Sequence, residues 1–115
     1  RARIGIQESR TAGALAGYEQ TVLRALEETE GALVAYSRAR EREERLRAAA
    51  AASLRAAELA RLRFDGGVTD FLTVLDAERR LLADQDQLVQ SEATTATALV
   101  AVYKALGGGW KPSAE

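Results

Sequence analysis

The amino-acid sequence predicts an all-α fold, a long antiparallel α-helical hairpin of the coiled-coil kind. Three observations support this prediction. Strong helix formers dominate the 115 residues, and the one proline, Pro112, lies near the end of the chain. Apolar or small residues recur every three or four positions in the first half and every seven in the second. Gly66 and Gly67 interrupt the helical pattern between the two halves.

The first helix is expected over about residues 14–63. Gly17 and Gly31 are its weak points, because each glycine costs about 1 kcal/mol relative to alanine inside a helix. The charged run from Arg38 to Arg47 alternates in sign, which indicates a solvated surface with pairs three or four residues apart. The residues expected to form the seam are Leu15, Tyr18, Val22, Leu26, Thr29, Leu33 and Tyr36.

A turn over residues 64–69 is expected to join this helix to a second one, over about residues 70–106, followed by a tail, 107–115. Glycine ends helices readily because it accepts the left-handed conformation, and Thr69 or Asp70 can cap the next helix through a side-chain oxygen. A seven-residue repeat predicts the seam of the second helix: Leu75, Leu82, Val89, Ala96 and Tyr103. Such a hairpin has one shared seam, so we expect further helices to cover its other faces.

Composition excludes several classes of function within this chain. Without Cys or His there is no zinc site of the usual kind, no thiol catalysis and no histidine acid–base chemistry. Glu78, Asp84, Asp86 and Glu92 are spread around the second helix, which favours solvated faces over a metal or acid–base centre. We therefore predict no enzyme activity, no cofactor and no metal. A net charge of −1 argues against a nucleic-acid partner. Since the chain begins at Arg1 rather than Met, we expect a segment of a longer protein.

Three stretches carry a family resemblance. The segment 61–77 combines arginine, an aromatic residue and glycine with a later Leu-x-x-Leu-Asp-Ala stretch, and it resembles the periplasmic-tip motif of the TolC-type outer-membrane efflux proteins. The segment 99–110 is similar to the terminal signature of the branch that serves resistance-nodulation-division (RND) pumps. The segment 18–28 resembles the start of the last long tunnel helix in that family.

The resemblance implies a homotrimer in which each full-length subunit contributes to an outer-membrane β-barrel and to a long α-helical tunnel. This segment would be the last helical pair of the tunnel, in the periplasm, with its turn at the tip nearest the inner membrane. The function implied is passive export of drugs or other small molecules, together with a periplasmic adaptor protein and an inner-membrane RND pump.

The resemblance also implies two sites. The first is an adaptor-docking tip made of Phe64, Gly66, Gly67, Thr69 and Asp70. The second is a tunnel constriction at Asp76, an acidic and gated position in related conduits, and at Thr73, where a relative can carry a further aspartate. A generic coiled-coil interaction module, or the hairpin of an adaptor, stays open as an alternative. An adaptor hairpin is normally flanked by lipoyl-like β segments, and this chain has no strand-like alternation.

Overall fold

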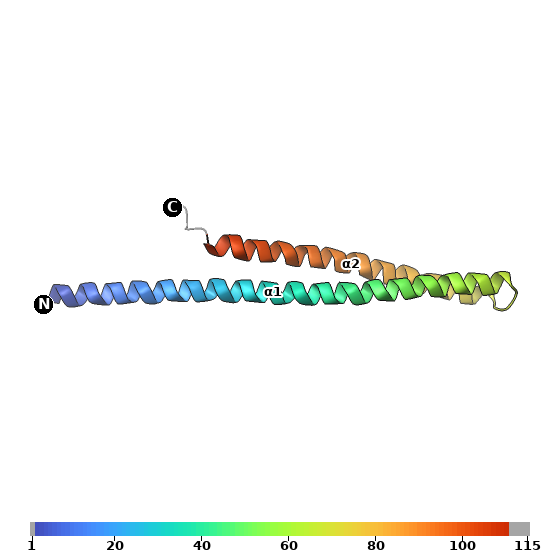
Figure 1. Ribbon diagram of the computed structural model, residues 1–115, viewed down its shortest axis with the longest axis horizontal. Helices are drawn as coiled ribbons and strands as arrows, with labels where there is room; N and C mark the ends of the chain where they lie inside the picture. The colour runs from blue at the N-terminus through green and yellow to red at the C-terminus, as the bar shows by residue number, and fades with distance from the viewer. Residues whose placement is uncertain (1, 111–115) are drawn as a thin grey trace. The chain divides into compact units, whose positions relative to one another are not determined.

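The computed structural model describes residues 2–110, which form two α-helices joined by a short turn (Figure 1). Helix α1 spans Ala2–Asp65 and helix α2 spans Phe71–Trp110. Side chains are described from Ser9 to Gly108. No strand occurs in this part of the chain, so the prediction of an all-α helical hairpin is confirmed. Neither described helix combines the length and apolarity that a membrane span requires.

The helices extend further than the sequence predicts. Helix α1 begins at Ala2 rather than near residue 14, and α2 continues through Gly107–Gly109 instead of ending at residue 106. Glycine weakens a helix by about 1 kcal/mol per residue but keeps its backbone N–H donor, so it does not force an end as proline does. Of the predicted tail 107–115, the last five residues lie outside the described part of the chain.

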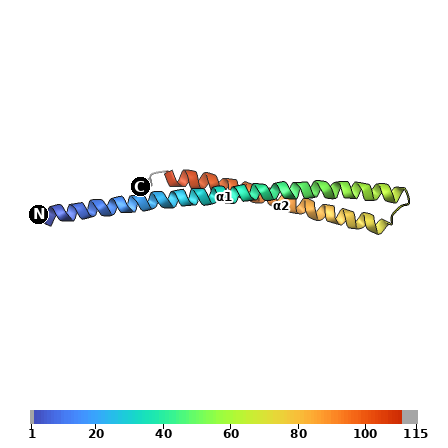
Figure 2. The same ribbon diagram turned by 60° about the horizontal axis from the view of Figure 1, so that its bottom comes forward.

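Contacts divide the chain into two compact units, and each is described by itself. One contains Arg1–Val34 with Leu99–Glu115. The other, Ala35–Ala98, contains the turn and is called the tip hairpin below. Within the tip hairpin α1 and α2 run antiparallel (Figure 2). All residues of the two predicted sites belong to the tip hairpin, which therefore determines their geometry.

The seam of the tip hairpin is built largely from small side chains. Buried positions on α1 are spaced by three and four residues, and those on α2 follow the same repeat. Small residues let two helix backbones approach closely, and the seven-residue repeat keeps their contacting faces together along the pair. The seam consists of Ala50, Ser53, Ala57 and Ala60 from α1 with Val74, Leu81, Asp84, Leu88 and Ser91 from α2.

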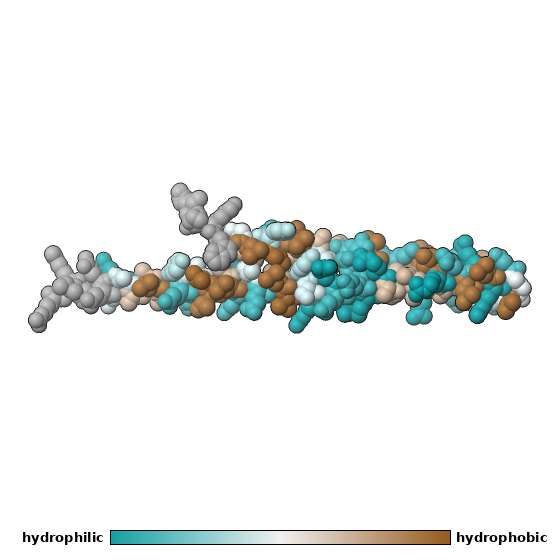
Figure 3. Space-filling view, viewed as in Figure 1, coloured by the Kyte–Doolittle hydropathy of each residue, from teal (hydrophilic) through white to brown (hydrophobic). Residues whose placement is uncertain are grey.

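The predicted seams are wrong in register on α2 and only partly right on α1. The predicted stripe on α2 lies one position after the real seam, and its members Leu82 and Val89 are 65% and 62% exposed. On α1, Val22, Thr29 and Tyr36 are half-buried, whereas Leu15, Tyr18, Leu26 and Leu33 are exposed. Alanine and serine carry little hydropathy signal, so the large apolar residues mark faces that this chain leaves uncovered. Figure 3 shows such side chains in brown among hydrophilic ones in teal.

Polar contacts tie the two helices of the tip hairpin together. The Ser53 hydroxyl donates to the Asp84 carboxylate within the seam, and Thr95 Oγ1 donates to the carbonyl of Ala39 at 3.3 Å. The predicted pairing along the charged run is confirmed at Glu43 and Arg47, which lie 2.7 Å apart. Hydrogen bonding by the Arg47 guanidinium lowers the pKa of the Glu43 carboxyl. The two hydrogen bonds between α1 and α2 help to set the register, which small apolar residues define only loosely.

Candidate functional site

The end of α1 is closed by a glycine motif. Gly67 has φ of +74°, the left-handed region that favours glycine. Its N–H donates to the Phe64 carbonyl at 3.0 Å, and the Val68 N–H donates to the Arg63 carbonyl at 2.8 Å. These two bonds form the Schellman arrangement, which satisfies carbonyl groups that the helix end would otherwise leave unpaired. The turn therefore needs glycine at position 67 for its backbone geometry alone.

The start of α2 is capped by Asp70. Asp70 Oδ1 accepts hydrogen bonds from the backbone N–H of Thr73 at 3.1 Å and from the Thr73 hydroxyl at 2.8 Å. This is the bond that an N-cap residue makes to the third residue of its helix. The two bonds from Thr73 lower the pKa of Asp70, because they stabilise the charged carboxylate. The capping prediction is confirmed for Asp70. Asp70 and Thr73 therefore have a structural role in this chain, independent of any contact with a partner protein.

Asp70→Ala is expected to increase amide hydrogen exchange in the first turn of α2, because the Thr73 N–H loses its acceptor. In the full-length protein, mass spectrometry of the peptide that follows the turn would measure the change. Since the folded-state pKa lies below the ordinary 3.8, the charged cap stabilises the helix above that pH and its contribution is lost as pH falls through the lowered pKa. Asp70→Asn is the control, because it keeps an acceptor and removes the pH dependence. Unchanged exchange in Asp70→Ala would contradict the assignment.

Two phenylalanines flank the turn and contact each other. The ring centroids of Phe64 and Phe71 are 5.4 Å apart, with the ring planes tilted by 56°. Such tilted contacts between aromatic rings are favourable, and this one joins the last turn of α1 to the first residue of α2. Phe64 remains 41% exposed and Phe71 53% exposed. The tip therefore presents a paired aromatic surface, of which the sequence analysis identified only Phe64.

An ion pair links the helices next to the tip. The Arg61 guanidinium donates to Glu78 Oε1 through Nε at 2.7 Å and also through Nη2. Two donors on one carboxylate oxygen link the two helix ends, and solvent screens the pair because the Arg61 side chain is 66% exposed. Sequence reasoning treated Glu78 as a solvated carboxylate and assigned Arg61 only to the family motif. The pairing of these two residues cannot be predicted from the sequence, because it depends on the register of the two helices.

The two residues of the predicted constriction, Thr73 and Asp76, lie close together on α2. Asp76 and Thr73 are three positions apart and both are exposed, so they lie on neighbouring parts of one helix face. Within the described residues Asp76 has no hydrogen-bond or ion-pair partner, whereas Thr73 donates to Asp70. Among the residues with described side chains, no group of acidic residues is arranged to hold a metal ion. Asp76 thus offers an unpaired carboxylate six residues beyond the Asp70 cap.

Comparisons with known proteins agree with the geometry. A family model described as outer membrane efflux protein matches residues 1–108. Outer membrane protein OprJ of Pseudomonas aeruginosa is 37% identical over 110 residues, which cover 96% of this chain and 23% of that protein. Solvent efflux pump outer membrane protein SrpC of Pseudomonas putida is 47% identical over 55 residues, which cover 48% of this chain and 12% of that protein.

A solved structure described as the outer-membrane channel OprN is similar to this chain in fold and sequence. The TM-score is 0.69 and the identity is 44%, over 97% of this chain and 25% of that one. This chain therefore spans a quarter or less of the length of these three relatives. Because a family model covers nearly all of its residues, the chain belongs to the outer membrane efflux protein family.

Proposed function

We propose that this chain is a wall segment of a trimeric outer-membrane efflux conduit, a passive channel that exports drugs or other small molecules. One observation carries the proposal: the match of residues 1–108 to the outer membrane efflux protein family. The same match favours the conduit over the alternative of an adaptor-protein hairpin. Energy for export comes from an inner-membrane RND pump, and a periplasmic adaptor joins that pump to the conduit.

Uncovered apolar side chains support assembly into a larger wall of helices. Leu54 on α1 and Leu82 on α2 line a groove beside the seam, and they are 44% and 65% exposed. Val89, one heptad after Leu82, continues this stripe. Exposed leucines at a regular spacing suit the packing of another helix, which would bury their surface at about 25 cal/mol per Å². In the proposed homotrimer this neighbour is a helix of the same subunit or of the next one.

The proposal places the tip hairpin in the periplasm, with the turn toward the inner membrane. Phe64, Gly66, Gly67, Thr69 and Asp70 then form the surface that an adaptor meets first. Asp76 and Thr73 lie just behind that surface, where three subunits converge on a narrow opening. The direction is supported by the place of the tip motif in the family resemblance and by the exposure of the turn, in which only Thr69 of these five residues is half-buried.

Export in cells tests this function. The full-length protein, expressed with its adaptor and pump in cells that lack an outer-membrane conduit of their own, is expected to restore efflux of a fluorescent dye. Purified trimers are expected to form ion-conducting pores in planar bilayers without any energy source. Cells with the conduit and adaptor but without the pump are the control, because a passive channel exports nothing alone. A well-assembled protein that neither conducts nor restores efflux would refute the proposal.

A further inference from the structure

The tip hairpin has two different sides flanking its seam. On one side, here called the paired face, lie both ion pairs that join the helices, Arg61–Glu78 and Arg47–Glu92. A groove on this side is lined by Leu54, Ala57, Glu58, Arg61, Glu78, Leu81 and Leu82. On the paired face two arginines therefore have acidic partners across the seam, whereas Glu58 has no ion pair within the described residues. Its exposed leucines suit contact with a neighbouring helix.

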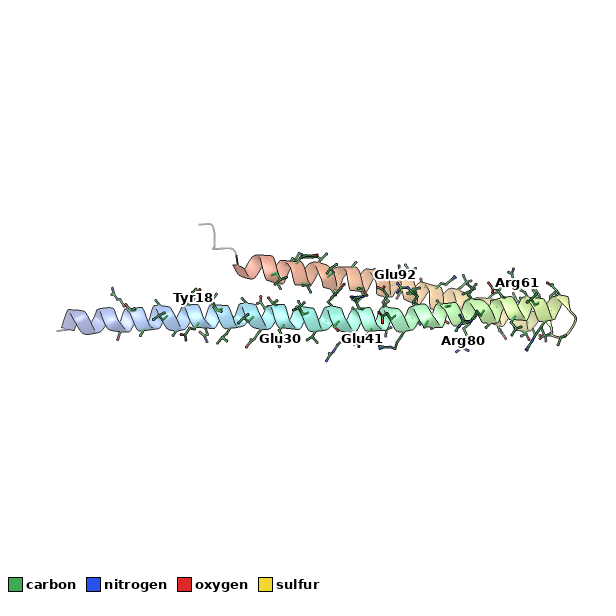
Figure 4. The ribbon with its side chains drawn as sticks, in the orientation of Figure 1. Tyr18, Glu30, Glu41, Arg61, Arg80 and Glu92 are labelled. Atoms are coloured by element: carbon green, nitrogen blue, oxygen red, sulfur yellow. The ribbon has the colours of Figure 1, made fainter. Side chains whose placement is uncertain are left out.

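The other side, here called the open face, carries a second groove. Alanines from α1 line it together with Arg80 and Asp84 from α2. Figure 4 shows Arg61 and Glu92 toward one edge of the tip hairpin and Arg80 toward the other. Asp76 precedes Arg80 by four residues, about one helical turn, so it lies on the open face as well. The lining residues of the groove are Ala49, Ala52, Ser53, Ala56, Arg80 and Asp84.

Three arginines of α1 share the open face with Asp76. Arg45 lies one heptad before Ala52, Arg42 lies one heptad before Ala49, and Arg38 lies one heptad before Arg45. Because residues seven apart keep the same side of a supercoiled helix, all three lie in line with the alanines of the open groove. These three residues are called the arginine band below.

The arginine band is exposed and unmatched in charge. None of its members takes part in an ion pair within the described residues, although Glu41, Glu43 and Glu44 lie between them in sequence. Further along α2, the heptad register of Arg80 and Asp76 continues through exposed polar residues without charge, Gln87, Gln90, Thr94 and Thr97. Gln90 donates to the Asp86 carboxylate at 2.9 Å. Like charges three and four residues apart repel each other along a helix, and the members of the band have this spacing. A bound anion would lower the energy of this repulsion.

We propose that the arginine band binds anionic solutes inside the conduit, behind the acidic tip. This inference rests on the proposed function, because the assignment of Asp76 to the conduit interior places the whole open face there. Guanidinium groups bind carboxylates and phosphates through paired hydrogen bonds, so the ligands are small molecules that carry those groups. A trimer repeats the band three times around one axis, which concentrates anions locally in water-filled space.

Bilayer recordings on the full-length trimer test the band, with inorganic pyrophosphate as the probe. Pyrophosphate is expected to block the wild-type pore at low salt. A triple variant should raise the half-blocking concentration of pyrophosphate by about tenfold, because several charge-assisted contacts to the anion are lost. This variant combines Arg38→Gln, Arg42→Gln and Arg45→Gln. It should also shift the reversal potential in a salt gradient toward cation preference. The matched control combines three other exposed arginines, Arg40→Gln, Arg55→Gln and Arg79→Gln. These have no ion pair within the described residues and do not line the open groove, so the control removes the same charge and should leave both readings near wild type.

A lysine variant of the arginine band separates charge from geometry. Arg38→Lys, Arg42→Lys and Arg45→Lys combined keep the three positive charges but replace each planar guanidinium with an ammonium group, which lacks the paired hydrogen bonds. The variant should therefore keep the anion preference of the pore and weaken the pyrophosphate block.

Unchanged block and unchanged reversal potential in the glutamine variant, with normal trimer abundance, would overturn the inference. Loss of adaptor-dependent export with unchanged block would overturn it too, because the band would then face an acidic protein outside the conduit. An assembled wild-type trimer that conducts nothing would instead refute the proposed function itself.

Discussion

Gly67→Trp is expected to abolish export in cells while the outer-membrane trimer still assembles. Gly67 lies at the end of the hairpin, and no atom lies within 4 Å of the position a side chain would occupy. A Trp side chain would therefore start from open space, on the surface that is proposed to receive the adaptor. The absence of a side chain at Gly67 lets another backbone approach closely, so a bulky group should block docking by sterics alone. Efflux rate, together with trimer abundance in isolated outer membranes, measures the effect.

Strain has to be separated from bulk in this experiment. Gly67→Ala imposes the same left-handed conformation on a residue with a Cβ, at a cost of about 1 kcal/mol, but adds little volume. Gly66→Ala adds a Cβ in ordinary contact, 3.5 Å from the Leu62 carbonyl, without a positive φ. Both alanine variants should keep most of the export.

Phe64→Ala is expected to weaken docking less than Gly67→Trp does. It removes one ring of the aromatic pair with Phe71 and leaves the glycine motif unchanged. If Gly67→Trp and Phe64→Ala both export at the wild-type rate, the tip is only a turn and the adaptor binds elsewhere.

The fold was predictable because its main signals are local. Helix formers without internal proline give two helices, Gly66 and Gly67 give the break, and Asp70 gives the cap. The seam was not predictable to the same degree. Its α1 side is Ala50, Ser53, Ala57 and Ala60, whose burial becomes visible only when the register of the partner helix is known. The stripe one position further along α2 gives the stronger periodic signal, and its members Leu82 and Val89 are exposed in this chain.

In the candidate sites, too, local features could be predicted from the sequence and contacts between helices could not. Phe64, Gly67 and Asp76 could be selected from the motif that contains them, and their assignments stay predictions. Contacts between helices, such as Arg61 with Glu78, depend on the register and could not be read from either residue. Phe71 did have a signal, since an aromatic residue follows the turn at nearly the distance at which Phe64 precedes it. The sequence pattern of the arginine band is that of a solvated charged run with alternating signs. That its three arginines have no ion pair within the described residues is known only from the structure.

Asp76→Asn in the full-length trimer is expected to change the conductance of the pore and to weaken its block by divalent cations. Asp76 is exposed and unpaired within the described residues, and it lies six residues after the Asp70 cap of α2. If three such carboxylates meet near one axis, they repel each other, and a cation between them lowers that energy. Loss of the three charges removes the cation site, so the half-blocking concentration of Ca²⁺ should rise by about tenfold or more, because carboxylates supply the main Ca²⁺ ligands.

The matched control is Glu58→Gln, which removes an exposed carboxylate from the paired face of the tip hairpin. It changes the charge of each subunit by the same amount, so a general effect of charge on the current would appear in both variants. A constriction at Asp76 predicts an effect in Asp76→Asn alone, and it predicts that the effect shrinks at high salt, where the carboxylates are screened. Equal conductance and equal block in Asp76→Asn and wild type would return Asp76 to an ordinary surface carboxylate. The narrow end of the conduit would then have to be formed by other residues.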